Sequence, residues 1–569
     1  MEELQGIIHG LSTAVLLSLF AFSSFCSASS THEAVGHKVP FMTVDFEDVL
    51  GRSFDYIIVG GGTSGCPLAA TLSTRYSVLL VERGGSPYGN PLIEERKNHG
   101  FLLIQTNQFT SIAQAFISEE GVSNRRGRVL GGTTTINGGL YSRASEDYIQ
   151  RVGWDAELVR ESYEWVESKM VFRPNPPTPW QSVSAEGMVE AGVQPFNGFS
   201  LEHVKGTKVG GSIFDIHGRR HTAADLLAAG NSKRITVLLN ATVQNVIFHD
   251  GGKCKRSVGD GKKPRAHGIR FIRSDGNPNH FYEAYLSYPK GSRSWGDVIL
   301  SAGTLGSPQI LMLSGIGPQE HLKHFNISPL VDARGVGQAM QDNPSIAFRL
   351  NYSPNAFQNP QPDPPQVVGI SDGFRIILIS VILPTSPNTT RTRIVAKNAN
   401  PVSRGSLRLW STDPRQNPSV KFNYLAKERD LDECVEMAHL VEKVAHSRSI
   451  ETFLGRRQSG IMNGSKYRDE ELRDFCKKNV STFYHYHGGC VVGSVVDKDY
   501  RVFGVKGLRV IDGSTLLKSP GTNPMATLLM LGRYQGIKMI RKRNYNSVSY
   551  PSESDDQYMT HPQPRSNSP

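Results

Sequence analysis

The clearest hydrophobic pattern lies between residues 54 and 83. Phe54 to Val59 is a short run of apolar, β-favouring residues, and glycines follow it directly at positions 60, 62 and 65. The segment CPLAATLS then reads as a helix, and YSVLLVERG reads as a second strand that ends in Glu82. A strand, a glycine turn, a helix, a strand and an acid in this order predict the first βαβ unit of a dinucleotide-binding fold.

Each glycine of this turn has a separate physical role. Gly60 allows the tight turn, Gly62 lets the backbone approach a pyrophosphate, and Gly65 permits close packing of helix and strand. The phosphates then lie against the helix N-terminus, where free N–H groups favour anions. Glu82, about 20 residues further on, is placed to bind a ribose. This pattern does not separate NAD from FAD.

Further patterns follow along the chain and predict a mixed α/β protein. VGWDAELVRESYEWVESKMVFRP predicts an amphipathic helix, followed by a Pro-rich linker through Pro179. Thr222 to Gly230 reads as a short helix with a threonine N-cap, and residues 231–248 return to strand character. Gly373 to Pro384 is a buried strand or helix. At 569 residues the chain is long enough for about two domains.

The first residues carry a different pattern. An apolar run from about Leu11 to Phe25 is followed by small residues ending at Ala28. Such a run is typical of a secretory signal peptide and is short for a membrane span, although Glu2 and Glu3 stand where basic residues are usual. We therefore expect residues 1–28 to be a signal peptide, the protein to be secreted, and no stable membrane insertion.

Secretion changes the meaning of two other features. Of the 6 cysteines, Cys26 lies in the predicted signal, and the odd remainder indicates few disulfides rather than a disulfide scaffold. We expect Cys434 and Cys476 to pair, because both flank the helices predicted before residue 481; free buried thiols are the alternative. Candidate glycosylation sequons occur at Asn240, Asn326, Asn351, Asn388, Asn463 and Asn479.

The formal charge of +11 raises the question of nucleic acid. Lys and Arg residues are scattered, however, and the only dense tract is KMIRKR near the C-terminus. A diffuse basic excess is more typical of solubility, or of attraction to anionic polymers, than of base reading. We expect no nucleic-acid partner, and the sequence does not predict an oligomeric state.

Two glycine-rich segments decide the family. GRVLGGTTTINGGLYSRASEDY (127–148) resembles the first signature of the glucose–methanol–choline (GMC) oxidoreductases, and GTLGSPQILMLSGIG (303–317) resembles the second. The resemblance extends from about Phe54 to Ile540 and is closest to the plant HOTHEAD-like and mandelonitrile-lyase-like branch. It implies FAD as cofactor, a Rossmann-like FAD-binding domain, and a discontinuous substrate domain built on a sheet flanked by helices.

The resemblance also assigns cofactor-binding residues. It implies that Thr63 and Ser64 lie by the diphosphate and that Glu82 binds the adenosine ribose beside Arg83. Val243 would contact the adenine end. The residues expected along or over the flavin are Val129, Thr133, Asn137, Gly138, Gly139, Leu140, Asp512, Gly513, Pro524 and Met525.

His485 and His487 stand one residue apart in STFYHYHGGC (481–490). On a strand they would face one side and could chelate Zn²⁺, but no nearby pattern supplies a third ligand, so we expect no metal. Without the resemblance, a structural role is the commoner one for isolated histidines. The resemblance instead matches His485 to the family's base near the flavin N5, and leaves His487 as a structural residue.

The family's second polar partner falls at Asn523. An amide can donate a hydrogen bond to a substrate oxygen, but it does not accept a proton at ordinary pH. The alternative for Asn523 is a turn residue before Pro524.

The motif order predicts the domain boundaries. We expect FAD-binding segments at 50–149, 219–330 and 481–543, substrate-domain segments at 150–218 and 331–480, and a disordered tail at 544–569. Between the segments at residues 359–374 and 394–409 the chain is shorter than its relatives, with ILISVILPTSPNTTRT in place of a longer stretch. A missing strand there would put activity in doubt more than FAD binding.

The leading hypothesis is an FAD-dependent enzyme that oxidises a primary alcohol to an aldehyde by hydride transfer to flavin, with a small hydroxylated molecule as substrate. The resemblance suggests a long-chain ω-hydroxy fatty acid. The alternatives are a hydroxynitrile (mandelonitrile) lyase that contains FAD, and a non-catalytic FAD-binding protein. The lyases of the family place a histidine where this chain has Asn523, which favours redox chemistry.

Overall fold

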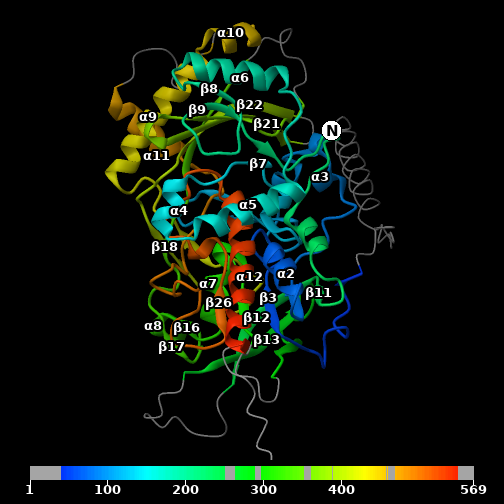
Figure 1. Cartoon of the computed structure of the whole chain (residues 1–569). Coiled ribbons are helices and arrows are strands. Elements are labelled where there is room, and N and C mark those ends of the chain that lie inside the picture. Colours follow the sequence, from blue (N-terminus) through cyan, green and yellow to red (C-terminus); the bar gives the residue numbers. More distant parts are fainter. Residues whose placement is uncertain are drawn as a thin grey trace, which may run out of the picture. The chain divides into compact units, whose positions relative to one another are not determined.

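Six parallel strands form the sheet that begins with the glycine motif (Figure 1). Each neighbouring pair in this sheet is parallel. Their order is β1 (Met42–Thr43), β11 (Ile235–Leu238), β4 (Val78–Val81), β3 (Tyr56–Val59), β15 (Val298–Leu300) and β26 (Leu508–Val510). Segments from both ends and the middle of the chain therefore stand side by side, and the predicted α/β class is confirmed.

The computed structural model describes residues 40–249, 263–288, 296–351, 361–386, 389–455, 458 and 468–548. The expected signal peptide, the sequons at Asn388 and Asn463, and residues 549–569 of the expected tail lie outside these ranges.

Both faces of the parallel sheet are buried, which explains its nearly continuous apolar strands. In β3, Ile58 packs on the side of α2 (Gly65–Ser73), α5 (Ala156–Met170) and α12 (Pro524–Val548). Ile57 points to the opposite side, toward α7 (Gly303–Leu313) and a four-stranded sheet. That sheet contains β12 (Ala241–His249), β13 (Arg265–Arg273), β14 (Phe281–Leu286) and β2 (Ser53–Phe54).

A second large sheet has seven strands and is mostly antiparallel. Its order is β25 (Ser481–Thr482), β19 (Pro344–Arg349), β22 (Thr389–Asn398), β21 (Ile376–Ser386), β20 (Val367–Ile370), β9 (Gly206–Val209) and β8 (Phe196–Phe199). Helices α6 (Pro179–Glu190), α9 (Glu428–Ala445) and α10 (Arg448–Leu454) cover one face, as the upper part of Figure 1 shows. A smaller apolar cluster, including Ile377, Ile379 and Val381, lies on the other face.

The shortened stretch leaves this sheet continuous. The segment Gly373–Pro384, expected as a strand or a helix, contributes the long strand β21, which is hydrogen-bonded to β20 on one side and to β22 on the other. Most of β21 is buried. The sheet therefore has no gap along β21.

The remaining helical segments and strands are short. The helical segments are α3 (Pro91–Glu94), η1 (Arg96–Asn98), η2 (Phe101–Leu103), η3 (Gly132–Thr135), α4 (Glu146–Val152), η4 (Ala223–Ala229), α8 (Gln319–His324), η5 (Asp372–Phe374), α11 (Asp469–Asn479) and η6 (Gly513–Thr515). The strands are β5 (Ala113–Ile117), β6 (Ser123–Gly127), β7 (Leu140–Tyr141), β10 (Gly211–Ser212), β16 (Ile316–Gly317), β17 (Val331–Asp332), β18 (Gln338–Met340), β23 (Gly405–Arg408) and β24 (Ser419–Lys421).

The predicted disulfide is confirmed. Cys434 in α9 and Cys476 in α11 are joined, with their Cα atoms 6.1 Å apart. Both sulfurs lie in the apolar core between these helices and the seven-stranded sheet. The bond therefore ties α11, which precedes the histidine motif, to the helix layer.

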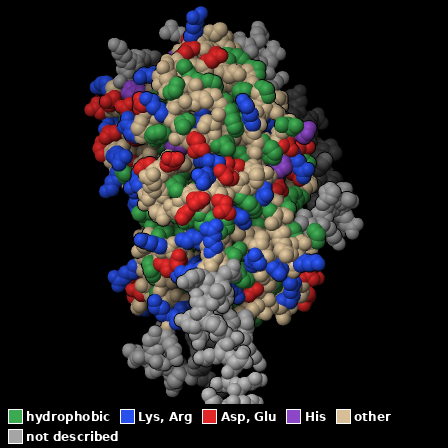
Figure 2. Space-filling model, viewed as in Figure 1, with side chains coloured by type: hydrophobic (Ala, Val, Ile, Leu, Met, Phe, Trp, Pro, Cys, Tyr) green, Lys and Arg blue, Asp and Glu red, His purple; other side chains and the backbone are tan. Residues whose placement is uncertain are grey.

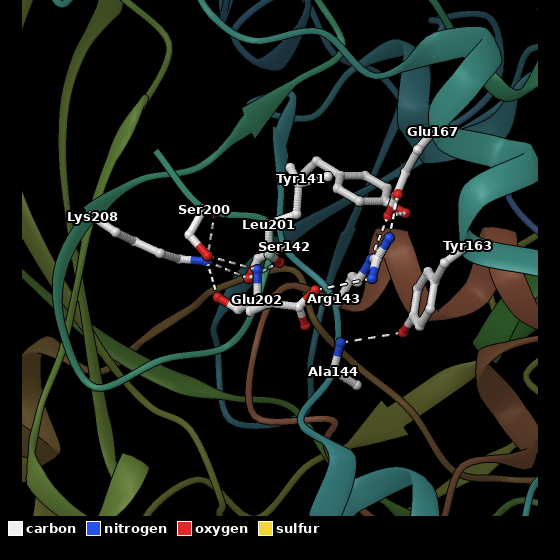
Figure 3. A network of polar contacts seen from close by, with 10 residues as sticks. All are labelled: Tyr141, Ser142, Arg143, Ala144, Tyr163, Glu167, Ser200, Leu201, Glu202 and Lys208. Atoms are coloured by element: carbon white, nitrogen blue, oxygen red, sulfur yellow. Dashed lines mark hydrogen bonds and ion pairs between the residues drawn. The ribbon is translucent and has the colours of Figure 1, made fainter. Parts of the chain in front are cut away.

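A polar network fastens the edge of the seven-stranded sheet to the segment after β7 (Figure 3). Lys208 of β9 is fully buried and donates to the hydroxyl of Ser142 at 3.0 Å. Beside it, the Arg143 guanidinium donates to both carboxylate oxygens of Glu167 in α5, at 2.7 and 2.6 Å. The network holds the end of the first glycine-rich signature in place.

Two boundaries differ from the sequence-based expectation. The linker ends at Thr178, because the Thr178 hydroxyl caps α6 and Pro179 occupies its first turn, where a missing N–H costs nothing. At the other end, α12 continues to Val548, so residues 544–548 are helical rather than part of the tail. Among the described residues, each helix is too short or too polar to cross a bilayer.

Candidate active site

One cavity runs along the glycine turn. It is lined by Gly60, Gly62, Thr63 and Ser64, and by Gly132 and Thr133 of the first GMC-like signature. Gly60 has a φ of 103°, and an added Cβ would lie 2.4 Å from the carbonyl oxygen of Ser301. Only glycine fits this close approach between β3 and the end of β15.

The helix after this turn offers its N-terminus to the cavity. No side chain caps α2, and its first turn contains no acidic residue. Its N-terminal N–H groups and dipole therefore favour an anionic group in this part of the cavity.

Glu82, Arg83 and Arg126 line another part of the cavity. The Glu82 carboxylate is buried and accepts from the main-chain N–H groups of Gly61 and Gly84, at 2.9 and 2.8 Å. Burial raises its pKa, and these N–H groups and Arg83 oppose the rise. Each carboxylate oxygen keeps a lone pair for a further donor, such as a ribose hydroxyl.

Arg83 and Arg126 share one neutral acceptor. Arg83 NH1 and Arg126 Nε lie 2.6 and 3.0 Å from Oε1 of Gln114. Neither guanidinium makes an ion pair within the described ranges. Burial, followed by the charge of Arg83, lowers the pKa of Arg126 well below its ordinary value. An anionic ligand in the cavity would offset this cost of burying two cations.

Asp512 joins the second GMC-like signature to the C-terminal motif. Its Oδ2 accepts from Gly303 N at 2.9 Å and from the Ser307 hydroxyl at 2.5 Å, while Oδ1 accepts from Ser514 N at 2.8 Å. Asp512, Gly513 and Gly303 all line the cavity. A Cβ added to Gly303 would meet no protein atom within 4 Å, so the backbone is bare on the cavity side.

These residues fit FAD, the cofactor that the resemblance implies. The cavity offers an uncapped helix N-terminus and two unpaired guanidinium groups for phosphates, a carboxylate for ribose hydroxyls, and glycines where side chains would intrude. Its lining also includes Tyr484, Tyr486 and Pro524, the chain neighbours of His485 and Asn523. The two ends of the chain therefore contribute to one elongated site.

The main chain at His485 is held by a buried carboxylate. Asp342 Oδ1 accepts from His485 N at 2.9 Å, and Oδ2 accepts from the hydroxyls of Thr482 and Tyr424, at 2.5 and 2.7 Å. Burial raises the Asp342 pKa to about 6, against the effect of these donors. The carboxylate thus fixes the irregular segment after β25 that carries the His485 ring.

The His485 ring has one occupied nitrogen. Its Nδ1 lies 3.1 Å from Nζ of Lys397, which also donates to the carbonyl oxygen of Thr522 at 3.1 Å. Nε2 makes no hydrogen bond within the described part of the chain, and the ring keeps part of its surface accessible. Burial, then the charge of Lys397, lowers the His485 pKa well below its usual value. The imidazole is therefore neutral at ordinary pH.

The His487 ring contacts the main chain of this segment rather than Lys397. Its Nδ1–H donates to the carbonyl oxygen of His485 at 3.0 Å, and burial lowers its pKa to about 4. The glycine that follows is sterically required, since a Cβ at Gly488 would lie 2.1 Å from the carbonyl oxygen of Ala339. His485 and His487 are thus held by different partners, which fits a structural His487.

Asn523 lies next to the residue that Lys397 contacts. Its side chain is partly exposed and makes no hydrogen bond to the described residues. The neighbouring Pro524 begins α12 and lines the cavity. Lys397 consequently contacts both the His485 ring and the main-chain carbonyl group of Thr522, the residue before Asn523.

The other predicted cofactor residues fall into two groups. Glu82, Arg83, Val243, Asp512, Gly513 and Pro524 line the cavity together with the glycine turn. A second group supports its walls. Asn137 Nδ2 lies 3.1 Å from the sulfur of Met525, and Asn137 Oδ1 accepts from Gly139 N. The supporting group comprises Gly65, Val129, Asn137, Gly138, Gly139, Leu140 and Met525.

Sequence reasoning missed Lys397, Asp342 and Arg126. Arg126 lies directly before the first signature, and a buried arginine in β6 has no local signal of its own. Lys397 and Asp342 are separated from His485 by 88 and 143 residues, and only the strand pairing brings them together.

Family models match most of the chain. The N-terminal GMC oxidoreductase model matches residues 54–345, and the C-terminal GMC oxidoreductase model matches residues 401–532. The two matches contain the glycine turn, both glycine-rich signatures, the histidine motif and Asn523.

Curated relatives cover nearly the full length. An (R)-mandelonitrile lyase-like protein of Arabidopsis thaliana is 45% identical, over 86% of this chain and 90% of its own. Protein HOTHEAD of the same plant is 41% identical over 87% and 89%. A sinapyl alcohol oxidase of Nesocodon mauritianus is 39% identical over 93% and 95%.

A solved structure gives the same fold. Formate oxidase from Aspergillus oryzae superposes with a TM-score of 0.72 at 20% identity, covering 87% of this chain and 99% of its own. The family matches, the relatives and the cavity agree on FAD as the cofactor. The chain belongs to the GMC oxidoreductases, a family of FAD-dependent enzymes.

Proposed function

We propose that the protein is a secreted alcohol oxidoreductase that converts a primary alcohol to the aldehyde. One observation carries this proposal. Tyr484 and Tyr486, on either side of His485, line the same cavity as the glycine turn, and so does Pro524 beside Asn523. Chain neighbours of both the assigned base and the assigned amide therefore line the cofactor cavity, which supports a catalytic role for His485 and Asn523.

The side chains present suit removal of a hydroxyl proton. The neutral His485 ring has Nε2 available to accept it, and the Asn523 amide can donate to the substrate oxygen and orient it. When bound, FAD supplies the acceptor for the hydride that leaves the carbinol carbon. We assign His485 as the base and Asn523 as the orienting partner.

The finer substrate class is a long-chain ω-hydroxy fatty acid, and the side chains on the Lys397 face of the seven-stranded sheet support it. Residues paired directly across antiparallel strands point to the same face of a sheet. Lys397 therefore shares its face with Ile377, and the next row places Val395 beside Ile379. These side chains form an apolar strip that starts at the base.

The strip ends in positive charge. Four residues from Lys397 on the same face of β22, about 13 Å along the strand, Arg393 pairs with Arg349 of β19. The Arg393 Nε is enclosed without a hydrogen bond to the described residues, and neither arginine makes an ion pair among them. A carboxylate at the far end of an alkyl chain would match this polarity.

Cyanohydrin cleavage is the second candidate, because lyases stand among the close relatives. A lyase needs no hydride acceptor, so the two activities give opposite results in one experiment. Protein mixed without oxygen with a long-chain ω-hydroxy fatty acid should lose its oxidised-flavin absorbance and form the ω-oxo acid. Release of cyanide from mandelonitrile, with no flavin reduction by any alcohol, would instead establish the lyase.

The substrate class has its own test. Arg393→Gln should raise KM for the ω-hydroxy acid by roughly 10-fold, because one charge-assisted hydrogen bond is lost. The 1-alkanol of the same length should be unaffected. Arg408→Gln, on the exposed strand β23, is the matched control. Equal KM changes for acid and alkanol would contradict the carboxylate assignment.

Secretion rests on the disulfide and on the expected signal peptide. Disulfides persist in oxidising compartments, and the sequons at Asn240, Asn326, Asn351 and Asn479 are exposed. N-terminal sequencing of protein purified from its native tissue should begin near residue 29. A mature N-terminus at Met1 would contradict this assignment.

A further inference from the structure

Lys397 is an unusual neighbour for a base. Its ε-amine is completely buried in β22 and has no carboxylate within ion-pair distance among the described residues. Instead it contacts a ring nitrogen of His485 and the carbonyl oxygen of Thr522, each at 3.1 Å, and lies 5.3 Å from the centre of the Phe483 ring. A buried ammonium group with such partners is poorly compensated.

The contact between Nζ and Nδ1 admits only one proton. If Lys397 is an ammonium ion, it donates to Nδ1, and the neutral imidazole must carry its own proton on Nε2. If Lys397 is a free amine, its lone pair can accept from Nδ1–H, which leaves the lone pair of the ring on Nε2. An ammonium ion at Lys397 therefore forces Nε2 to be a donor, and only the uncharged amine allows Nε2 to be an acceptor.

We propose that Lys397 is the positioning residue that holds His485 in its reactive tautomer, by accepting the Nδ1 proton as an uncharged amine. This inference rests on the proposed function for its consequence in catalysis, but the tautomer itself is independent of it. In the productive state the alcohol O–H proton passes to Nε2, and Nδ1–H remains hydrogen-bonded to the amine. The hydride leaves the carbinol carbon for the cofactor, so charge and atoms balance.

The surroundings favour the uncharged amine. Burial lowers the Lys397 pKa to about 7, and the charge of Asp342 opposes that shift. The other titratable groups that interact with it are His485, His487 and His203, each with a pKa lowered mainly by burial. Asp342 is thus the one described acid that acts on Lys397, and its hydrogen bonds are already taken by other donors.

A pH dependence follows. Below about pH 7, Lys397 becomes charged, donates to Nδ1 and forces the proton of His485 onto Nε2, so kcat falls. Above that pH the amine accepts and kcat reaches its plateau. The acid limb of the profile therefore reports Lys397 rather than His485, whose own pKa lies far lower.

Three substitutions test this assignment. Lys397→Gln should keep substantial kcat and lose the acid limb, because its amide oxygen accepts from Nδ1–H at every pH. Lys397→Met should lower kcat by about 10-fold with little change in KM, since the tautomer is no longer fixed. Lys397→Arg, a permanent donor, should lower it by about 100-fold or more, the scale of a lost general base. Bound FAD, measured by its visible absorbance, is the check on folding.

The ranking of the three Lys397 variants by kcat decides between the proposal and its alternative. A cation that only stabilises a developing alkoxide would make Lys397→Arg more active than Lys397→Gln, and that order would overturn the proposal. The second measurement is the ¹⁵N signal of His485, assigned by its loss in His485→Gln, at about pH 8. We expect the proton on Nδ1; a proton on Nε2 would overturn the proposal. If no alcohol reduces the flavin, the proposed function fails, while this signal still decides the tautomer.

Discussion

At the scale of single residues, the candidate site depends on how His485 is held. Asp342 fixes its main chain, Lys397 occupies Nδ1, and Nε2 remains accessible. Because Nδ1 is occupied, the neutral imidazole can exchange a proton with a substrate only at Nε2.

Replacing the base should separate catalysis from cofactor binding. His485→Gln should lower kcat by about 1,000-fold, within the range for a lost general base. FAD content should stay near that of the wild type, because His485 does not line the cofactor cavity. His439→Gln, at a partly exposed position on α9, is the matched control. Rapid-mixing absorbance measures flavin reduction in both variants. Unchanged kcat in His485→Gln would remove His485 from the mechanism.

Asn523 should act on the same step more weakly. Asn523→Ala removes one donor to the substrate oxygen, so kcat/KM should fall by roughly 10- to 100-fold. The shape of the pH profile should not change, because an amide does not titrate. A fall accompanied by a shifted acid limb would mean that the substitution disturbs Lys397 through Thr522 instead.

The residue scale also shows where sequence information ends. His485 and Asn523 are assigned as base and partner because the motif around each is local and resembles a family pattern. Lys397 lies in TTRTRIVAKN, an alternating strand in which a lysine is expected to face solvent. Its burial arises only because the His485 segment and the Thr522 backbone close over that face.

At the scale of elements, β21 and β22 pair along nearly their whole length, and β22 carries Lys397. The sequence indicated a shortened, apolar segment here without deciding between strand and helix. Its β-branched residues and its length are compatible with a strand, but the pairing partners lie far apart in the chain. The segment forms a strand because it pairs in register with distant strands, and no local pattern encodes that register.

The disulfide should contribute measurable stability to this layer. It closes a loop of 42 residues, and closing a loop of that length stabilises by about 2–4 kcal/mol. Cys434→Ala with Cys476→Ala should therefore lower Tm by several degrees. A reducing agent should lower Tm of the wild type and leave the double variant unchanged. Equal responses of the two proteins to reductant would contradict the expected contribution.

At the scale of the whole molecule, three buried histidines link stability to pH. Burial lowers the pKa of His99 and His203 to about 3 and that of His487 to about 4. Their unfolded pKa is about 6.5, so the unfolded chain binds more protons below that value. Their contribution is complete above about pH 6.5 and is lost as the pH falls toward 4. The Asp342 pKa is raised instead, so its contribution to the free energy of unfolding is lost as the pH rises through about 6.

His99→Asn should make this dependence shallower. Each buried histidine contributes a slope of up to about 1.4 kcal/mol per pH unit in the free energy of unfolding between pH 4 and 6.5. The variant should lose one such contribution, whatever the change in absolute stability. Denaturant unfolding at several pH values measures the slope. An unchanged slope would mean that His99 is not held neutral in the folded protein.

The general architecture was largely accessible from the sequence. The glycine turn, the α5 and η4 helical segments, and the strands from 231 to 248 follow from local patterns, and the structure contains them. The seven-stranded sheet was expected only through family resemblance. On the face shown in Figure 2, acidic and basic side chains are interspersed, in keeping with the diffuse basic excess of the chain.

The central claim is that FAD lies in the elongated cavity, with its reactive end beside His485. The most direct measurement is the visible spectrum of the purified protein before and after an alcohol is added without oxygen. We predict a yellow protein whose flavin absorbance is lost with a long-chain ω-hydroxy acid, and lost about 1,000-fold more slowly in His485→Gln. A folded protein that is colourless and takes up no added FAD would contradict the account.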